Sequence, residues 1–107
     1  MQAKKADVGD PFDALGDANR RAIVEALRDG PRSVAEITAG MQISQPAVSR
    51  HLRLLKQARL VTDEPVGARR LYRLSDEGPA AIRTYMEQVW GEVASRFRLV
   101  AENPPRK

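Results

Sequence analysis

The sequence has no cysteine and a single histidine, His51. A disulfide, a thiolate metal site or a cysteine nucleophile therefore cannot form, and one chain lacks the ligand sets of common zinc sites. No stretch approaches the roughly 20 apolar residues that cross a bilayer. Lys4 and Lys5 are followed by residues 6–10 (ADVGD) and not by the apolar run of a secretory signal. We therefore expect a cytoplasmic protein and predict no cofactor.

Aromatic residues are also few, at 5% of 107 residues, whereas 42% of the residues are hydrophobic and 30% are charged. This composition suffices for one compact domain and is too small for two. We predict a single domain over residues 11–101. Residues 1–10 lack hydrophobic periodicity and are predicted to be a flexible N-terminal segment, and residues 102–107 a loose C-terminal tail.

The charge is unevenly distributed along the chain. The net charge is +4, and residues 44–74 hold seven Lys and Arg against two Asp and Glu, a net of +5. The rest of the chain has a net charge of −1. Acidic residues at the i,i+4 spacing that would neutralise this basic segment are almost absent. A local basic patch of this kind indicates a nucleic-acid partner.

Capping residues predict a series of short helices. Asp17 is placed to cap a helix that runs to about Asp29, where Gly30 and Pro31 end it. Ser33 and Glu36 have the spacing of a capping box before a short helix over residues 34–41. Ser44 caps a helix to about residue 58, which places Val48, Leu52 and Leu55 on one face and Gln45, Ser49, Arg50 and Arg53 on the other.

The sequence from residue 60 onward predicts a hairpin and a long helix. Residues 60–62 and 70–74 are strand-forming, and residues 65–68 have turn chemistry between them. After Pro79, apolar residues recur at helical spacing, with Tyr85 and Trp90 beside them. The members of this stripe are Ile82, Met86, Val89, Val93, Phe97 and Val100.

A short helix, a turn, a helix with a polar face and a basic hairpin together predict a mainly α fold with a small β-hairpin, the winged helix-turn-helix. The second helix would enter the major groove, where Gln45 can pair with adenine and Arg50 with guanine. Arg53 and Lys56 are better placed for phosphates, and Arg69 and Arg70 at the hairpin tip for the minor groove. The predicted DNA-binding residues are Ser44, Gln45, Pro46, Ser49, Arg50, Arg53 and Lys56 on the recognition helix, and Arg69 and Arg70 on the wing.

The long apolar stripe exceeds what so small a domain needs to cover, so a homodimer through the terminal helices is predicted. Such a dimer would hold two recognition helices about 34 Å apart. An aromatic stripe at this spacing favours packing over a ligand pocket. The predicted interface residues are Phe12, Leu15, Ile82, Tyr85, Met86, Val89, Trp90, Val93 and Phe97.

Residues 12–21 (FDALGDANRR) and residues 43–52 (ISQPAVSRHL) resemble the ArsR family of bacterial transcriptional repressors, over about residues 11–100. Within that family the sequence is most similar to the SdpR-like branch without metal ligands. The resemblance implies a homodimer that binds a palindromic double-stranded DNA operator, often at its own promoter, and blocks polymerase. It also implies base contacts for Gln45, Ser49 and Arg50 and DNA contacts for Arg69 and Arg70. The basic pair Arg20 and Arg21 matches the family, where its role can be structural.

The sequence departs from the metal-sensing members of this family. Metal-sensing members carry cysteines at the start of the helix over residues 34–41, or His and carboxylate sets on the last helix, and neither set is present. We therefore expect no metal site, and a small-molecule inducer is left open. A winged-helix module that binds an acidic protein is the alternative function. No triad or phosphate loop supports an enzyme, because Ser49 has no general base on its own face.

Overall fold

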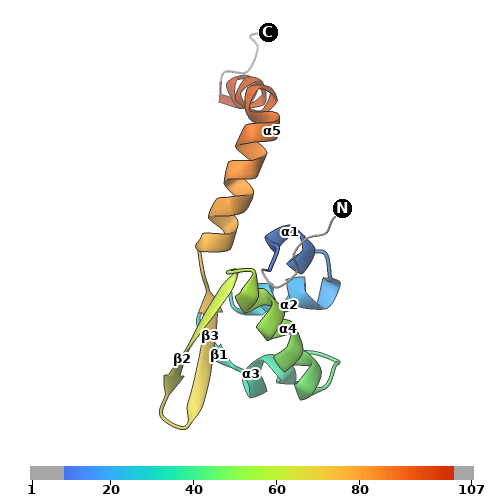
Figure 1. Ribbon diagram of the computed structural model, residues 1–107, viewed down its shortest axis with the longest axis vertical. Helices are drawn as coiled ribbons and strands as arrows, with labels where there is room; N and C mark the ends of the chain where they lie inside the picture. Colours follow the sequence, from blue (N-terminus) through green and yellow to red (C-terminus); the bar gives the residue numbers. More distant parts are fainter. Residues whose placement is uncertain (1–8, 103–107) are drawn as a thin grey trace.

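The computed structural model describes residues 9–102, with side chains described up to Val93. Short helices and a small sheet form the body, and a long C-terminal helix projects from it (Figure 1). The elements are α1 (Pro11–Ala14), α2 (Ala18–Ala26), β1 (Arg32–Ser33), α3 (Val34–Ala39), α4 (Gln45–Gln57), β2 (Val61–Val66), β3 (Arg69–Leu74) and α5 (Glu77–Glu102). This order confirms the winged helix-turn-helix, with α3 and α4 as the helix pair and β2 and β3 as the wing.

Capping side chains start the helices where the sequence predicts. Asp17 accepts the backbone N–H of Arg20 at 3.1 Å, and Ser44 accepts that of Ala47 at 3.2 Å. Both halves of the capping box form between Ser33 and Glu36. Each cap satisfies amide groups that the first turn of a helix leaves free.

The core lies where α2, α3 and α4 meet the start of β2. Five side chains from these elements, Ile23, Ile37, Leu52, Leu55 and Val48, are at most 1% exposed. The predicted apolar face of the recognition helix is thereby confirmed. Burying a side chain of this size stabilises a fold by about 1.5–3 kcal/mol, so the core fixes how α4 is turned toward solvent.

Two differences from the predicted boundaries concern α2 and the wing. Helix α2 ends at Ala26 and not near Asp29, because the amide of Leu27 is shared between the carbonyls of Ile23 and Val24 and tight turns follow. Pro65 lies within β2 and not in the turn. It is tolerated there because β2 is an edge strand, where a missing N–H breaks no ladder bond on the open side.

A third strand, β1, was not predicted. Its two residues pair antiparallel with β3, Arg32 opposite Tyr72 and Ser33 opposite Leu71, so the sheet order is β1-β3-β2. A two-residue strand has no alternation that a pattern search could detect. Its effect is to attach the wing to the start of α3.

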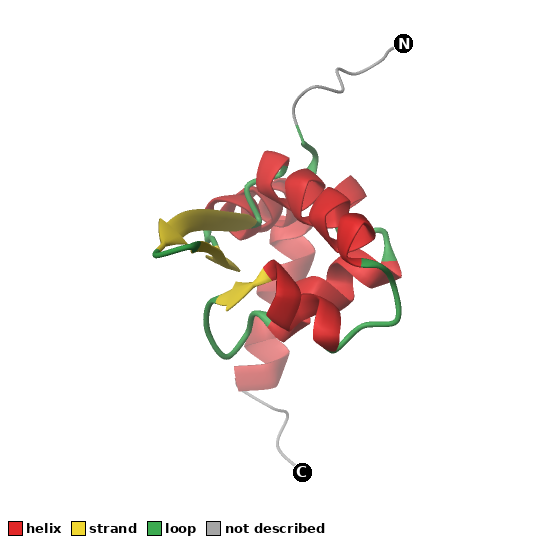
Figure 2. Cartoon of the chain, turned by 90° about the horizontal axis from the view of Figure 1, so that it is seen from below, coloured by secondary structure: helices red, strands yellow, loops and turns green. Residues whose placement is uncertain are grey.

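The two ends of the molecule carry different surfaces. The hairpin tip and the N-terminal part of α4 lie at one end, and α5 extends from the other (Figure 1). Seen from below, the hairpin stands beside the cluster of helices (Figure 2). Among the described residues, no helix is long and apolar enough to span a membrane.

Candidate nucleic-acid interface

The predicted base-reading residues lie together on the first turns of α4. Gln45, Ser49 and Arg50 are all exposed, as are Ser44 and Pro46 at the start of the helix. The Ser44 hydroxyl is occupied as the helix cap. The opposite face of α4 is buried, so these side chains extend away from the body. Their contact with DNA remains a prediction.

A polar cluster beneath α4 holds it against the N-terminal helices. The guanidinium of Arg20 donates from Nε to the carbonyl of Ala14 at 2.7 Å and from Nη1 to His51 Nδ1 at 3.3 Å. Arginine has no acceptor, so His51 Nδ1 accepts this bond. His51 is 8% exposed, so its ring belongs to this packing and is not presented to a phosphate. The basic pair at the start of α2 is structural, since Arg21 likewise donates to the carbonyl of Leu15 at 2.7 Å.

The wing presents its two predicted arginines on β3 beside a tight turn. Val66 pairs with Arg69, so Gly67 and Ala68 form a two-residue loop, and Gly67 has a φ of 63°. Glycine at the first loop position is typical of hairpins with this loop length. Arg69 and Arg70 are both exposed at this end.

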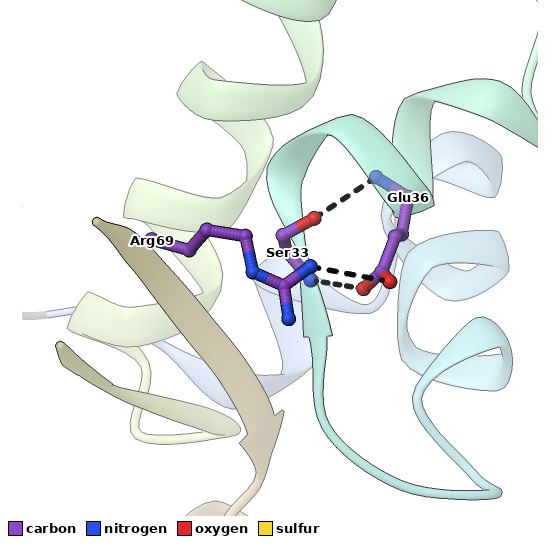
Figure 3. A network of polar contacts seen from close by, with 3 residues as sticks. All are labelled: Ser33, Glu36 and Arg69. Atoms are coloured by element: carbon purple, nitrogen blue, oxygen red, sulfur yellow. Dashed lines mark hydrogen bonds and ion pairs between the residues drawn. The ribbon is translucent and has the colours of Figure 1, made fainter. Parts of the chain in front are cut away.

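Arg69 reaches the N-terminus of α3 (Figure 3). Its Nη1 lies 3.4 Å from Glu36 Oε2, while the other oxygen of Glu36 accepts the amide of Ser33 at 2.8 Å. Both partners are about half exposed. An exposed pair of this kind contributes about 0–1 kcal/mol, so Arg69 can exchange Glu36 for a phosphate at little cost.

Asp63 is the residue at this surface that the sequence did not single out. Its Oδ1 lies 2.9 Å from Lys56 Nζ on α4, and its Oδ2 lies 2.9 Å from Arg70 Nη1 on β3. Acidic partners of the basic segment therefore exist, but the fold supplies them across elements and not at helical spacing. The one sequence signal was an acidic pair within an otherwise basic stretch, which also includes Glu64, 3.9 Å from Arg73.

Arg50 and Arg53 form no ion pair within the described residues, and both are exposed. Apart from Arg59, which follows α4 and also forms no ion pair among the described residues, the paired and unpaired cations of this segment separate by position. The start and middle of α4 carry free guanidinium groups, and the end of α4 and the wing carry groups held by Asp63, Glu36 and Glu64. Free cations on a groove-sized helix suit contact with DNA.

Three carboxylates here have pKa values below their ordinary range. Burial raises the pKa of Asp63, but hydrogen bonds and charges from Lys56 and Arg70 lower it by more. The backbone N–H of Ser33 is the main cause of the low pKa of Glu36, and that of Arg20 the main cause for Asp17. All three are therefore ionised at neutral pH.

These shifts predict acid destabilisation. A carboxylate whose pKa is lower in the folded than in the unfolded state stabilises the fold at pH values above its unfolded pKa, which is 3.8 for Asp63. This stabilisation is lost as the pH falls through the folded pKa. We expect the unfolding free energy of Asp63→Asn to fall less than that of the wild type as the pH is lowered from 5 to about 3. Urea denaturation followed by circular dichroism at fixed protein concentration measures this difference.

Glu64→Gln is the matched control for this experiment, because Glu64 lies next to Asp63 but its side chain is 55% exposed and meets Arg73 only at 3.9 Å. As the pH is lowered, the unfolding free energy of Glu64→Gln should fall by the same amount as that of the wild type. If Asp63→Asn also follows the wild-type curve, the ion pairs of Asp63 do not stabilise the fold.

The predicted dimerisation residues form an exposed apolar face on α5 and α1. Along α5, Tyr85, Met86, Val89, Trp90 and Val93 are 45–54% exposed. Phe12 is 44% exposed, and its ring lies edge-on to Tyr85 at a centroid distance of 5.0 Å.

Two of the predicted interface residues are less exposed than these, and a third lies outside the described side chains. Leu15 packs partly against the core of its own chain, and Ile82 is partly buried. The Phe97 side chain, like that of Val100, lies outside the described residues.

Within residues 9–102, no three His, Asp or Glu side chains come together in a way that could hold a metal ion.

Comparisons with known proteins agree with this arrangement. The family model described as "Bacterial regulatory protein, arsR family" matches residues 17–63, from the cap of α2 into β2. A helix-turn-helix transcriptional regulator of Mycobacterium tuberculosis is 51% identical over 79 residues, which is 74% of this chain and 74% of that protein. The transcriptional repressor SdpR of Bacillus subtilis is 36% identical over 64 residues, 60% of this chain and 71% of the repressor.

A solved structure extends the similarity to the whole fold. The crystal structure described as a possible transcriptional regulator for arsenical resistance superposes with a TM-score of 0.71 at 34% identity. The match covers 92% of this chain and 100% of that chain.

Proposed function

The chain belongs to the ArsR family of bacterial regulatory proteins, and we propose that it acts in the cytoplasm as a homodimer that represses transcription from an inverted-repeat operator. It is a DNA-binding transcriptional regulator, as its relatives are named. No catalytic step forms part of this function.

The observation that carries the proposal is the exposed polar face of α4 beside the basic wing. A major groove admits one α-helix, and a hairpin at the same end of the domain can then reach the flanking backbone. Gln45, Ser49 and Arg50 would read bases. Arg53, Lys56, Arg69 and Arg70 would hold phosphates or the minor groove.

Dimerisation supplies the second half of the operator. The apolar face of α5, with Phe12 beside it, is the surface with the residue types to bury against a second copy. A C2 dimer presents the same patch twice and so reads two half-sites in inverted orientation. Repression would follow because the bound dimer excludes polymerase from the promoter.

Selection of bound duplexes from a pool with a randomised centre tests this function. We expect enrichment of two inverted half-sites whose centres lie about 10 base pairs, or a multiple of that, apart. Enrichment of a single unrepeated site would contradict the dimer. Recovery of no sequence would favour a module whose basic surface binds an acidic protein.

The wing should contribute affinity without sequence preference. Arg69→Ala removes one phosphate contact, so binding should weaken by the same factor on the selected duplex and on a scrambled one, and the salt dependence should fall by about one counterion. Fluorescence anisotropy at several salt concentrations gives both quantities. Arg28→Ala, which removes an exposed charge outside the basic segment, should change neither. A loss confined to the selected duplex would assign Arg69 to base reading.

A further inference from the structure

A single carboxylate joins the recognition helix to the wing. Asp63 on β2 contacts Lys56 in the last turn of α4 through one oxygen and Arg70 on β3 through the other, both at 2.9 Å. Asp63 lies opposite Tyr72 in the hairpin register, so Arg70 is its diagonal neighbour across the strands. The side chain of Asp63 is only 5% exposed.

The burial of Asp63 makes these contacts obligatory. A carboxylate removed from water is costly unless it is paired and hydrogen-bonded. Lys56 and Arg70 are the cations that pair with it, one from each side of the junction between helix and hairpin. The position of the wing relative to α4 is therefore fixed by this carboxylate as well as by the apolar core.

The two cations keep donors for another partner. Their side chains are 53% and 52% exposed, although each gives a hydrogen bond or ion pair to Asp63. An ammonium group has three donors and a guanidinium five. Each can therefore contact a phosphate while Asp63 holds it in place.

We propose that Asp63 is a positioning residue for operator recognition, which holds Lys56 and Arg70 at a fixed separation so that their phosphate contacts set the register of α4 in the groove. This inference rests on the proposed function, since it deepens the account of the same DNA-binding surface. The carboxylate also leaves the three groups with one net positive charge instead of two. Asp63 thus disfavours random DNA electrostatically and favours the one phosphate spacing that matches the fixed pair.

The alternative is that Asp63 contributes only charge or stability. Glu64 separates these possibilities, because it is the next residue on the same strand, carries the same charge and meets Arg73 only at 3.9 Å with both side chains over half exposed. Glu64→Gln and Asp63→Asn each raise the net charge of the wing by one, from opposite faces of the hairpin. Only Asp63→Asn releases the link between α4 and the wing.

The test compares binding of wild type, Asp63→Asn and Glu64→Gln to the duplex selected by the wild type and to a scrambled duplex of the same composition. Both variants should bind scrambled DNA more tightly by a similar small factor, with a steeper salt dependence. Asp63→Asn should lower the ratio of selected to scrambled affinity by about tenfold, whereas Glu64→Gln should change it less than about twofold. Equal ratios for the two variants would overturn the proposal.

A second measurement separates positioning from a general loss of structure. In the background of Lys56→Gln with Arg70→Gln, the partners through which Asp63 acts are absent, so Asp63→Asn should change the affinity ratio by less than about threefold. An undiminished effect there would mean that Asp63 acts through other residues and would overturn the proposal. If the wild-type protein does not prefer its selected duplex, the proposed function is overturned. If the wild type prefers that duplex and the two variants change the affinity ratio equally, only this inference is overturned.

Discussion

Val89→Glu should convert the protein to a monomer and weaken operator binding by roughly 100- to 10,000-fold. Val89 is 52% exposed near the middle of the apolar face of α5. A charge there would have to be buried without a partner in the dimer, which is strongly unfavourable. A monomer would lose the gain in affinity that comes from two linked half-sites.

Thr84→Glu is the control for this variant, since Thr84 is exposed on the opposite side of the same helix. It introduces the same charge and should leave the dimer and its affinity unchanged. Light scattering after size exclusion gives the oligomeric state, and anisotropy gives the affinity. A Val89→Glu protein that is dimeric and binds normally would place the dimer interface elsewhere.

Arg50→Ala should cost about 1–3 kcal/mol of operator binding and relax the preference at one base position in each half-site. Arg50 is exposed near the start of α4 and has no acidic partner among the described residues. Its two parallel donors match the acceptors of guanine in the major groove. The effect should appear in repeated duplex selection with the variant and in titrations of single-base substitutions.

Arg53→Ala is the matched comparison, because Arg53 is also exposed and unpaired in the described part of the chain but lies one turn further along α4. It should weaken selected and scrambled duplexes alike, as a phosphate contact does. If Arg50→Ala weakens both duplexes equally, Arg50 reads no base.

The local rules of helix capping account for most of what the sequence predicted. Asp17, Ser33 and Ser44 each begin a helix as expected, because a cap acts within three residues and does not depend on the rest of the fold. The exposed and buried faces of α4 followed from periodicity alone. The exposed apolar face of α5 followed in the same way, although its partner is a proposal.

Features that depend on contacts between different elements were not predicted. Strand β1 exists only because β3 lies beside it, and Pro65 joins a strand only because β2 is at the sheet edge. The ion pairs of Asp63 connect neighbouring elements through residues seven positions apart, and the contact between Arg20 and His51 connects residues 31 positions apart. Spacing rules detect partners within one element, so these contacts needed the fold.

We expect the exposed face of α4 and the wing to recognise a particular DNA sequence and not only negative charge. Anisotropy titration of the wild-type protein on its selected duplex and on a scrambled duplex, at about 50 and 200 mM salt, tests it most directly. We expect a preference of at least about a thousandfold for the selected duplex, with steep loss of affinity at the higher salt. Equal, weak binding to both duplexes would contradict it and leave a basic surface without sequence recognition.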